Sequence, residues 1–215
     1  IGPNYILDVA KFFTKKKCVA GVVNFKHQVS KDTFINKNIK EYEKILKYNA
    51  SEIHKIGSPY GYVSMGSTIV CKQNGYIAVG GMSNKKATED FYFLQQLAKH
   101  TKIFTISNVI VHPSSRAEER VYLGTGYRMR NLSKEENIDS LKISKAVIKS
   151  LHFLFSTINK CKQNSTEEIL NVIRIHDMKL WDFLYNHNIQ KIFPMLYKTS
   201  STKKQFISQF HRWFD

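Results

Sequence analysis

Apolar and polar residues in the first 130 positions follow two different periods. Three short runs rich in β-branched residues predict strands: Val19–Phe25, Ser64–Cys71 and the buried run Ile103–Val111. Three segments with apolar residues at helical spacing predict amphipathic helices: Asn4–Phe13, Lys40–His54 and Phe91–Lys99. The polar segment Ser30–Asn38 predicts a loop. Because strands and helices alternate, this part of the chain is expected to form α/β layers.

After Arg130 only the helical period remains. Ser133-Lys-Glu-Glu136 and Ser165-Thr-Glu-Glu168 match the capping box that opens helices. Three further stretches carry the helical period or aromatic, basic side chains: Ile138–Ile158, Ile169–Tyr185 and Tyr197–Asp215. The pattern predicts an α/β domain over residues 1–130 and a tail of three or four helices over residues 131–215.

Composition is that of a globular chain, with 215 residues of which 42% are apolar. The three cysteines lack C-x-x-C spacing and are odd in number, which favours a reducing compartment over a disulfide framework. No apolar stretch approaches the roughly 18 residues of a membrane span, and no signal peptide is recognisable. The sequence does not begin with Met, so we expect either a trimmed chain or a piece of a longer protein.

The net charge of +16 favours anionic partners but does not distinguish among the classes of them. Such a charge suits nucleic acid, an anionic membrane surface or phosphorylated ligands. The lysines are spread along the sequence, and the only dense run is Lys15-Lys16-Lys17. Most of them are therefore expected to lie on a solvated surface.

Two adjacent acids, Glu89 and Asp90, open the helix predicted from Phe91. Carboxylates at a helix start often serve only to stabilise its N-terminal end. Here the acids also follow the glycine turn Gly80-Gly81 and lie in a loop between two predicted strands, where α/β proteins hold their sites. An ionised Asp in such a loop can accept a proton from a hydroxyl nucleophile. Both interpretations are open.

Basic residues follow the strand that ends at Val111. His112 at the strand end could bind a divalent cation or a phosphate, or be an ordinary surface residue. Arg116 and Arg120, four positions apart, could clamp a diphosphate. The alternative is that the two arginines pair with Glu118 and Glu119.

The order of these motifs resembles the second half of the catalytic domain of glycosyltransferase family 2, which has the GT-A fold. The resemblance covers roughly residues 3 to 130. Its motifs are Gly66-Ser67, Gly80-Gly81-Met82, Thr88-Glu89-Asp90, Val111-His-Pro-Ser-Ser-Arg116 and Arg120-Val-Tyr-Leu-Gly124-Thr-Gly126, with Asn4-Tyr5 and Glu41-Tyr-Glu43 as weaker matches. Each motif is weak singly, whereas the order and spacing together are fairly specific.

The resemblance implies an inverting transfer of sugar from a nucleotide-diphosphate sugar to a glycan or lipid-linked acceptor. Asp90 would be the catalytic base and Glu89 its support. His112 would help to hold the Mg²⁺ or Mn²⁺ bound to the diphosphate, and Arg116 and Arg120 would neutralise the leaving group. The glycines and Ser67 would border the donor diphosphate or the acceptor: Gly66, Ser67, Gly80, Gly81, Gly124 and Gly126.

One departure from the family is large, because no D-x-D metal motif occurs in the sequence. The resemblance therefore implies the C-terminal part of a GT-A-like enzyme that is inactive alone and works in the cytoplasm at the inner face of a membrane. The sequence leaves a homodimer open. Gln209-Phe-His-Arg212-Trp213 matches a Q-x-x-R-W pattern of processive members, but it lies much farther from Asp90 than theirs does. A basic nucleic-acid-binding module and a helical adaptor are the alternatives.

Overall fold

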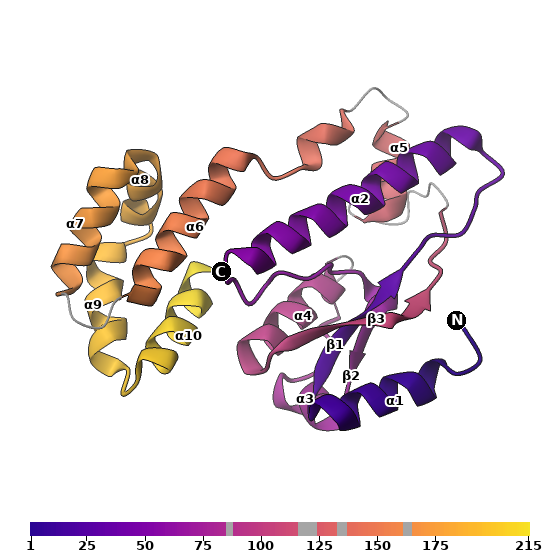
Figure 1. Cartoon of the computed structure of the whole chain (residues 1–215), viewed down its shortest axis with the longest axis horizontal. Helices are drawn as coiled ribbons and strands as arrows, with labels where there is room; N and C mark the ends of the chain where they lie inside the picture. The colour runs from indigo at the N-terminus through magenta and orange to yellow at the C-terminus, as the bar shows by residue number, and fades with distance from the viewer. Residues whose placement is uncertain (85–87, 116–123, 133–136, 161–164) are drawn as a thin grey trace. The chain divides into compact units, whose positions relative to one another are not determined.

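The computed structural model describes residues 1–84, 88–115, 124–132, 137–160 and 165–215 (Figure 1). The chain divides into two compact units. The N-terminal unit comprises residues 1–54 and 59–142, and the C-terminal unit comprises residues 55–58 and 143–215. The expected α/β class is confirmed in its coarse form: a small mixed sheet with helices, and a helical C-terminal region.

The sheet of the N-terminal unit has three strands in the order β2-β1-β3. The central strand β1 (Ala20–Phe25) pairs antiparallel with β2 (Ile69–Cys71) and parallel with β3 (Ile103–Val111). Gly21 permits a close approach of β1 to β3, because a Cβ atom there would stand 2.7 Å from the carbonyl oxygen of Phe104. The register of β1 against β3 shifts between Val23 and Asn24.

Two amphipathic helices supply the apolar core around β1. Helix α1 (Tyr5–Lys16) packs Val9 and Phe13 into a cluster with Val23, Phe25 and Ile106. Helix α4 (Glu89–His100) packs its apolar face into a second cluster around Ala20 and Val22. Residues alternate in direction along a strand, so neighbouring positions of β1 serve different clusters.

Helix α2 (Thr33–Lys55) begins earlier than the sequence pattern predicts. The Oδ1 atom of Asp32 accepts hydrogen bonds from the backbone N–H groups of Phe34 and Ile35, at 2.8 and 3.3 Å. The loop predicted over Ser30–Asn38 is therefore wrong from Thr33 onward, because Asp32 caps the helix. Helix α5 (Thr125–Leu132) packs against α2 through Met129 and Leu132.

The strands β2 and β3 differ from their predicted forms. The run Ser64–Cys71 forms a short 3₁₀ turn, η1 (Gly66–Thr68), and only then β2, after which α3 (Gln73–Ala78) follows. The bounds predicted for β3 are correct, but its burial is not. Thr105 and Ser107 are exposed, because the face of the sheet on which they lie is not fully covered by other side chains.

The C-terminal unit contains five described helices: α6 (Lys145–Lys160), α7 (Thr166–His176), α8 (Met178–Asn186), α9 (Ile189–Thr199) and α10 (Lys203–Phe214). Their number exceeds the predicted three or four. The stretch predicted as one helix from Ile138 begins instead with a 3₁₀ turn, η2 (Ile138–Leu141), and the stretch Ile169–Tyr185 is divided between α7 and α8. None of the described helices is long and apolar enough to cross a membrane.

One of the two predicted capping boxes lies within the described residues. The Ser165 hydroxyl accepts from the N–H of Glu168, and the Glu168 carboxylate accepts from the N–H of Ser165, which confirms the box at the start of α7. The other, Ser133–Glu136, lies outside the described residues.

Candidate functional site

The carboxylate of Asp90 lies beside Gly66, which is far from it in the sequence. A Cβ atom at Gly66 would stand 3.5 Å from Asp90 Oδ2. Gly66 opens η1 and Asp90 lies in the first turn of α4, so packing of α4 against the sheet brings the two together. Two residues of the predicted site therefore share one location, next to the exposed Ser67.

The two oxygens of Asp90 have different surroundings. Oδ1 accepts a hydrogen bond of 2.7 Å from the backbone N–H of Phe91, one of the N–H groups that a helix start leaves without a helical partner. Thr88, the N-cap residue, makes no side-chain cap bond and has a left-handed backbone with φ of 65°. Stabilisation of the helix start thus accounts for Oδ1, and Oδ2 is the oxygen that faces Gly66.

Tyr42 and Arg128 are two residues to which the sequence assigned no role in the site, and Tyr42 lies in electrostatic reach of both Arg128 and Asp90. Burial raises the pKa of the Tyr42 phenol, the Arg128 charge lowers that pKa and the Asp90 charge raises it. Both charges therefore act on one buried phenol, which packs against Met129, the neighbour of Arg128. Tyr42 of α2 thus lies within electrostatic reach of Asp90 on α4 and Arg128 on α5. Such relationships between distant segments leave no local sequence signal.

The predicted glycines lie in different structural settings. Gly80 and Gly81 have positive φ values of 76° and 75°, and a Cβ atom at Gly81 would stand 2.8 Å from the Tyr76 ring. This turn therefore packs against α3. Gly124 has φ of 101°, and Gly126 lies in the first turn of α5. Arg116 and Arg120 lie outside the described residues.

His112 is exposed, and its Nδ1 lies 2.9 Å from the carbonyl oxygen of Lys26. A carbonyl oxygen only accepts hydrogen bonds, so Nδ1 carries the proton and the neutral ring presents a lone pair at Nε2. Metal-binding histidines commonly have this arrangement. However, the described residues contain no group of three or more His, Cys, Asp or Glu side chains that could hold a metal ion. A site for Mg²⁺ or Mn²⁺ stays a prediction.

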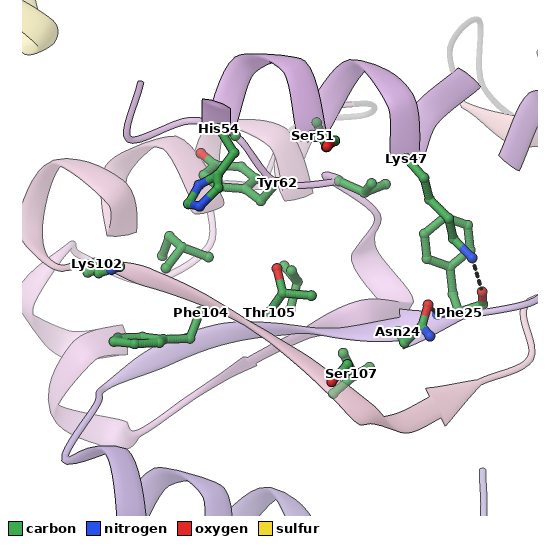
Figure 2. A pocket seen from close by; sticks show the side chains of 16 residues that line it. Asn24, Phe25, Lys47, Ser51, His54, Tyr62, Lys102, Phe104, Thr105 and Ser107 are labelled. Atoms are coloured by element: carbon green, nitrogen blue, oxygen red, sulfur yellow. Dashed lines mark hydrogen bonds between the residues drawn. The ribbon is translucent and has the colours of Figure 1, made fainter. Parts of the chain in front are cut away.

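A cavity of about 490 Å³ lies elsewhere in the N-terminal unit, between α2 and the strands β1 and β3 (Figure 2). No residue of the predicted catalytic, diphosphate or metal set lines it. The cavity and the acids at the start of α4 are thus separate features of this unit.

No protein-family model, curated protein or solved structure was found to match this chain. The candidate site therefore consists of what its own residues provide: Asp90 beside Gly66, with Tyr42 and Arg128 close to it.

Proposed function

We propose that this chain forms the acceptor side of an inverting glycosyltransferase. The enzyme would transfer a sugar from a nucleotide-diphosphate sugar to a hydroxyl group of a glycan or glycolipid. The position of Asp90 carries the proposal, because its Oδ2 faces Gly66, which has no side chain, while Oδ1 is held by the N–H of Phe91. A carboxylate fixed through one oxygen, with space beside the other, suits a general base.

In the proposed step, Asp90 takes the proton of the acceptor hydroxyl as the hydroxyl oxygen attacks the anomeric carbon. The bond from that carbon to the diphosphate breaks, and its electron pair leaves with the nucleotide diphosphate. Attack from the opposite side inverts the anomeric configuration. One positioned base is sufficient for such an in-line displacement.

Positive charge stabilises the leaving diphosphate, and helix α5 of the N-terminal unit carries such a charge. Arg128 acts on the same phenol as Asp90, so its guanidinium lies within electrostatic reach of the site. Arg116 and Arg120 remain candidates for the same role. Preorganised cations at a developing negative charge are among the largest contributions to catalysis.

The donor half of the reaction requires residues that this sequence lacks. The chain has no D-x-D motif, and His112 is a single candidate ligand among the described residues. We therefore assign the nucleotide and its divalent cation mainly to residues outside this sequence, and we expect the chain to be inactive alone. An enzyme that makes surface glycans would work at the cytoplasmic face of a membrane.

The test is Asp90→Asn in the protein that contains this chain, assayed by release of nucleotide diphosphate from UDP- and GDP-sugars. We expect transfer to fall by about 100-fold or more, the range of general-base contributions. Binding of the donor should be unchanged, because Asp90 acts on the acceptor. Asp8→Asn, which removes a carboxylate from α1 and lies outside the predicted site, is the matched control and should retain most of the activity.

If Asp90→Asn transferred sugar at a rate within about twofold of the parent, Asp90 would not be the general base. A nucleic-acid-binding module is the competing explanation of the net charge of +16. Tight binding of single-stranded DNA that weakens steeply with added salt, together with intact transfer in Asp90→Asn, would favour that module instead.

A further inference from the structure

The cavity between α2 and the sheet has the size of a small-molecule site. Its volume is about 490 Å³, within the roughly 300–1,000 Å³ of typical ligand pockets. One wall is the C-terminal half of α2 and the opposite wall is formed by β1 and β3 (Figure 2). The loop at Gly61, Tyr62 and Val63 closes a third side.

Apolar and aromatic side chains form much of the cavity surface. Val22, Ile103 and Phe104 come from the strands, and Tyr62 comes from the loop. A planar ring can pack on such a surface, because aromatic side chains favour stacked or edge-on contact with other rings. A layer between a helix and a sheet is normally filled by side chains at close-packed density. Here small side chains at Ala50, Thr105 and Ser107 leave the space open.

The charges around the cavity have one sign. Lys47 and Lys102 line it, whereas none of the described lining residues is Asp or Glu. Figure 2 shows the two lysine side chains at opposite ends of the cavity. A cleft lined by one sign of charge concentrates ligands of the opposite sign.

Each lysine is held by an aromatic ring. The Lys47 ammonium donates to the carbonyl oxygen of Phe25 at 3.1 Å and lies 4.8 Å from the centroid of the Phe25 ring. The Lys102 ammonium lies 5.2 Å from the centroid of the Phe104 ring. An ammonium group has three N–H donors, so Lys47 keeps donors for a ligand after bonding to Phe25.

We propose that this cavity binds a small aromatic anion. The ring of the ligand packs between the strands and Tyr62, and its acidic group binds Lys47 or Lys102. The hydroxyl groups of Ser51, Thr105 and Ser107 supply hydrogen bonds to polar ring substituents. Binding here is separate from the proposed sugar transfer, since Asp90 does not line the cavity.

The experiment uses the fluorescent aromatic sulfonate 8-anilinonaphthalene-1-sulfonate as the probe. Titration of the chain should show one saturable site with increased fluorescence. Lys47→Gln or Lys102→Gln, whichever removes the lysine that binds the sulfonate, should weaken binding by about 10-fold, the loss of one charge-assisted hydrogen bond. The matched control is Lys40→Gln, which removes the same charge from the same helix at an exposed position outside the cavity. It should change binding by less than about twofold.

Competition then separates two sources of the anion. Uridine monophosphate offers a ring with a phosphate, and indole-3-acetate offers a ring with a carboxylate. Displacement of the probe by either supports the proposal and indicates which acid the site prefers. Failure of both to displace it overturns the proposal, as does equal binding in Lys47→Gln, Lys102→Gln and Lys40→Gln.

Filling the cavity provides a second test. Ala50→Phe adds a ring from α2, and Thr105→Phe adds one from the exposed edge strand. Variants that retain the circular dichroism spectrum and the melting transition of the parent should lose probe binding. Undiminished binding in either folded variant contradicts the assignment of the probe to this cavity.

Discussion

His27 and Glu43 form a buried pair that joins the end of β1 to helix α2. The Nδ1 atom of His27 lies 2.7 Å from Glu43 Oε1, and the same oxygen accepts the backbone N–H of His27. Only 1% of the His27 side chain and 14% of the Glu43 side chain are exposed. Within the described part of the chain, the second ring nitrogen of His27 is buried without a hydrogen-bond partner. Glu43 is therefore the group that stabilises this imidazole.

Glu43→Ala should lower the free energy of unfolding by roughly 2–3 kcal/mol, because it leaves two buried donors of His27 without an acceptor. Urea denaturation followed by circular dichroism measures the change. Glu41→Ala is the matched control on the same helix. Glu41 pairs with Lys44 at the surface, with 47% and 72% of the two side chains exposed, and should contribute less than about 0.5 kcal/mol. Equal losses in both variants would contradict the importance of the buried pair.

A second prediction concerns His211 in the C-terminal unit. Burial lowers the pKa of His211 from 6.5 to about 4. Its ring lies 4.6 Å from that of Phe155 and is 7% exposed. Between these two pH values the unfolded chain binds a proton that the folded chain does not. Stability is therefore complete above pH 6.5 and is lost as the pH falls toward 4, by at most roughly 3 kcal/mol.

The measurement is urea denaturation at a series of pH values in that window. His211→Phe should have a shallower loss of stability with falling pH than the parent, because its side chain does not titrate. His152→Gln replaces an exposed histidine on α6 and should retain the slope of the parent. Parallel pH profiles for the parent and His211→Phe would show that burial of His211 does not cause the loss.

Local patterns predicted much of the fold, and the errors have local physical causes. The polar composition of residues 30–38 concealed the start of α2, although Asp32 was a visible cap before Phe34. The apolar period continues through Asp177, so α7 and α8 were predicted as one helix. In the structure Asp177 Oδ1 accepts the N–H of Leu180 at 3.0 Å and caps α8. A side chain that bonds the backbone in this way competes with continuation of the helix.

The candidate site was predictable only in part. The placement of Asp90 at a helix start follows from the pattern of residues around it. Its nearness to Gly66 and the roles of Tyr42 and Arg128 depend on packing between elements that are distant in sequence. The pair of His27 and Glu43 was missed for the same reason. Such contacts follow from the tertiary arrangement rather than from any local spacing.

A third prediction contrasts two glycines. A Cβ atom at Gly66 would be in ordinary contact with Asp90 Oδ2 at 3.5 Å, so Gly66→Ala should fold with a melting temperature within about 2 °C of the parent. A Cβ atom at Gly21 would stand 2.7 Å from the Phe104 carbonyl oxygen. Gly21→Ala should therefore separate β1 from β3 and cost roughly 1–3 kcal/mol.

Scanning calorimetry of the two variants provides the comparison. If Asp90 is the base, Gly66→Ala should also slow the proposed sugar transfer, because its methyl group occupies space beside Oδ2. Transfer at the rate of the parent would mean that the acceptor does not approach Asp90 from the side of Gly66. A destabilised Gly66→Ala would contradict the contact itself.

The last prediction tests the electrostatic relationship among Asp90, Tyr42 and Arg128. The negative charge of Asp90 raises the pKa of Tyr42, so Asp90→Asn should lower that pKa. The positive charge of Arg128 lowers it, so Arg128→Gln should raise it further. Burial, the largest cause of the raised pKa, should be the same in both variants. A loss of packing would shift the Tyr42 pKa in the same direction in both variants. Opposite shifts would therefore come from the two charges.

Tyrosine labelled with ¹³C at Cζ allows the Tyr42 phenol to be titrated by NMR from about pH 9 to 12. Tyr42→Phe identifies the resonance, since the chain has 11 tyrosines. Asp8→Asn removes a carboxylate from α1 and serves as the control for a change in net charge. It should leave the Tyr42 titration where it is in the parent. Shifts of the same sign in Asp90→Asn and Arg128→Gln would mean that the two charges do not act on Tyr42 in the folded chain. The proposed site would then lose Arg128 as a cation for the leaving diphosphate.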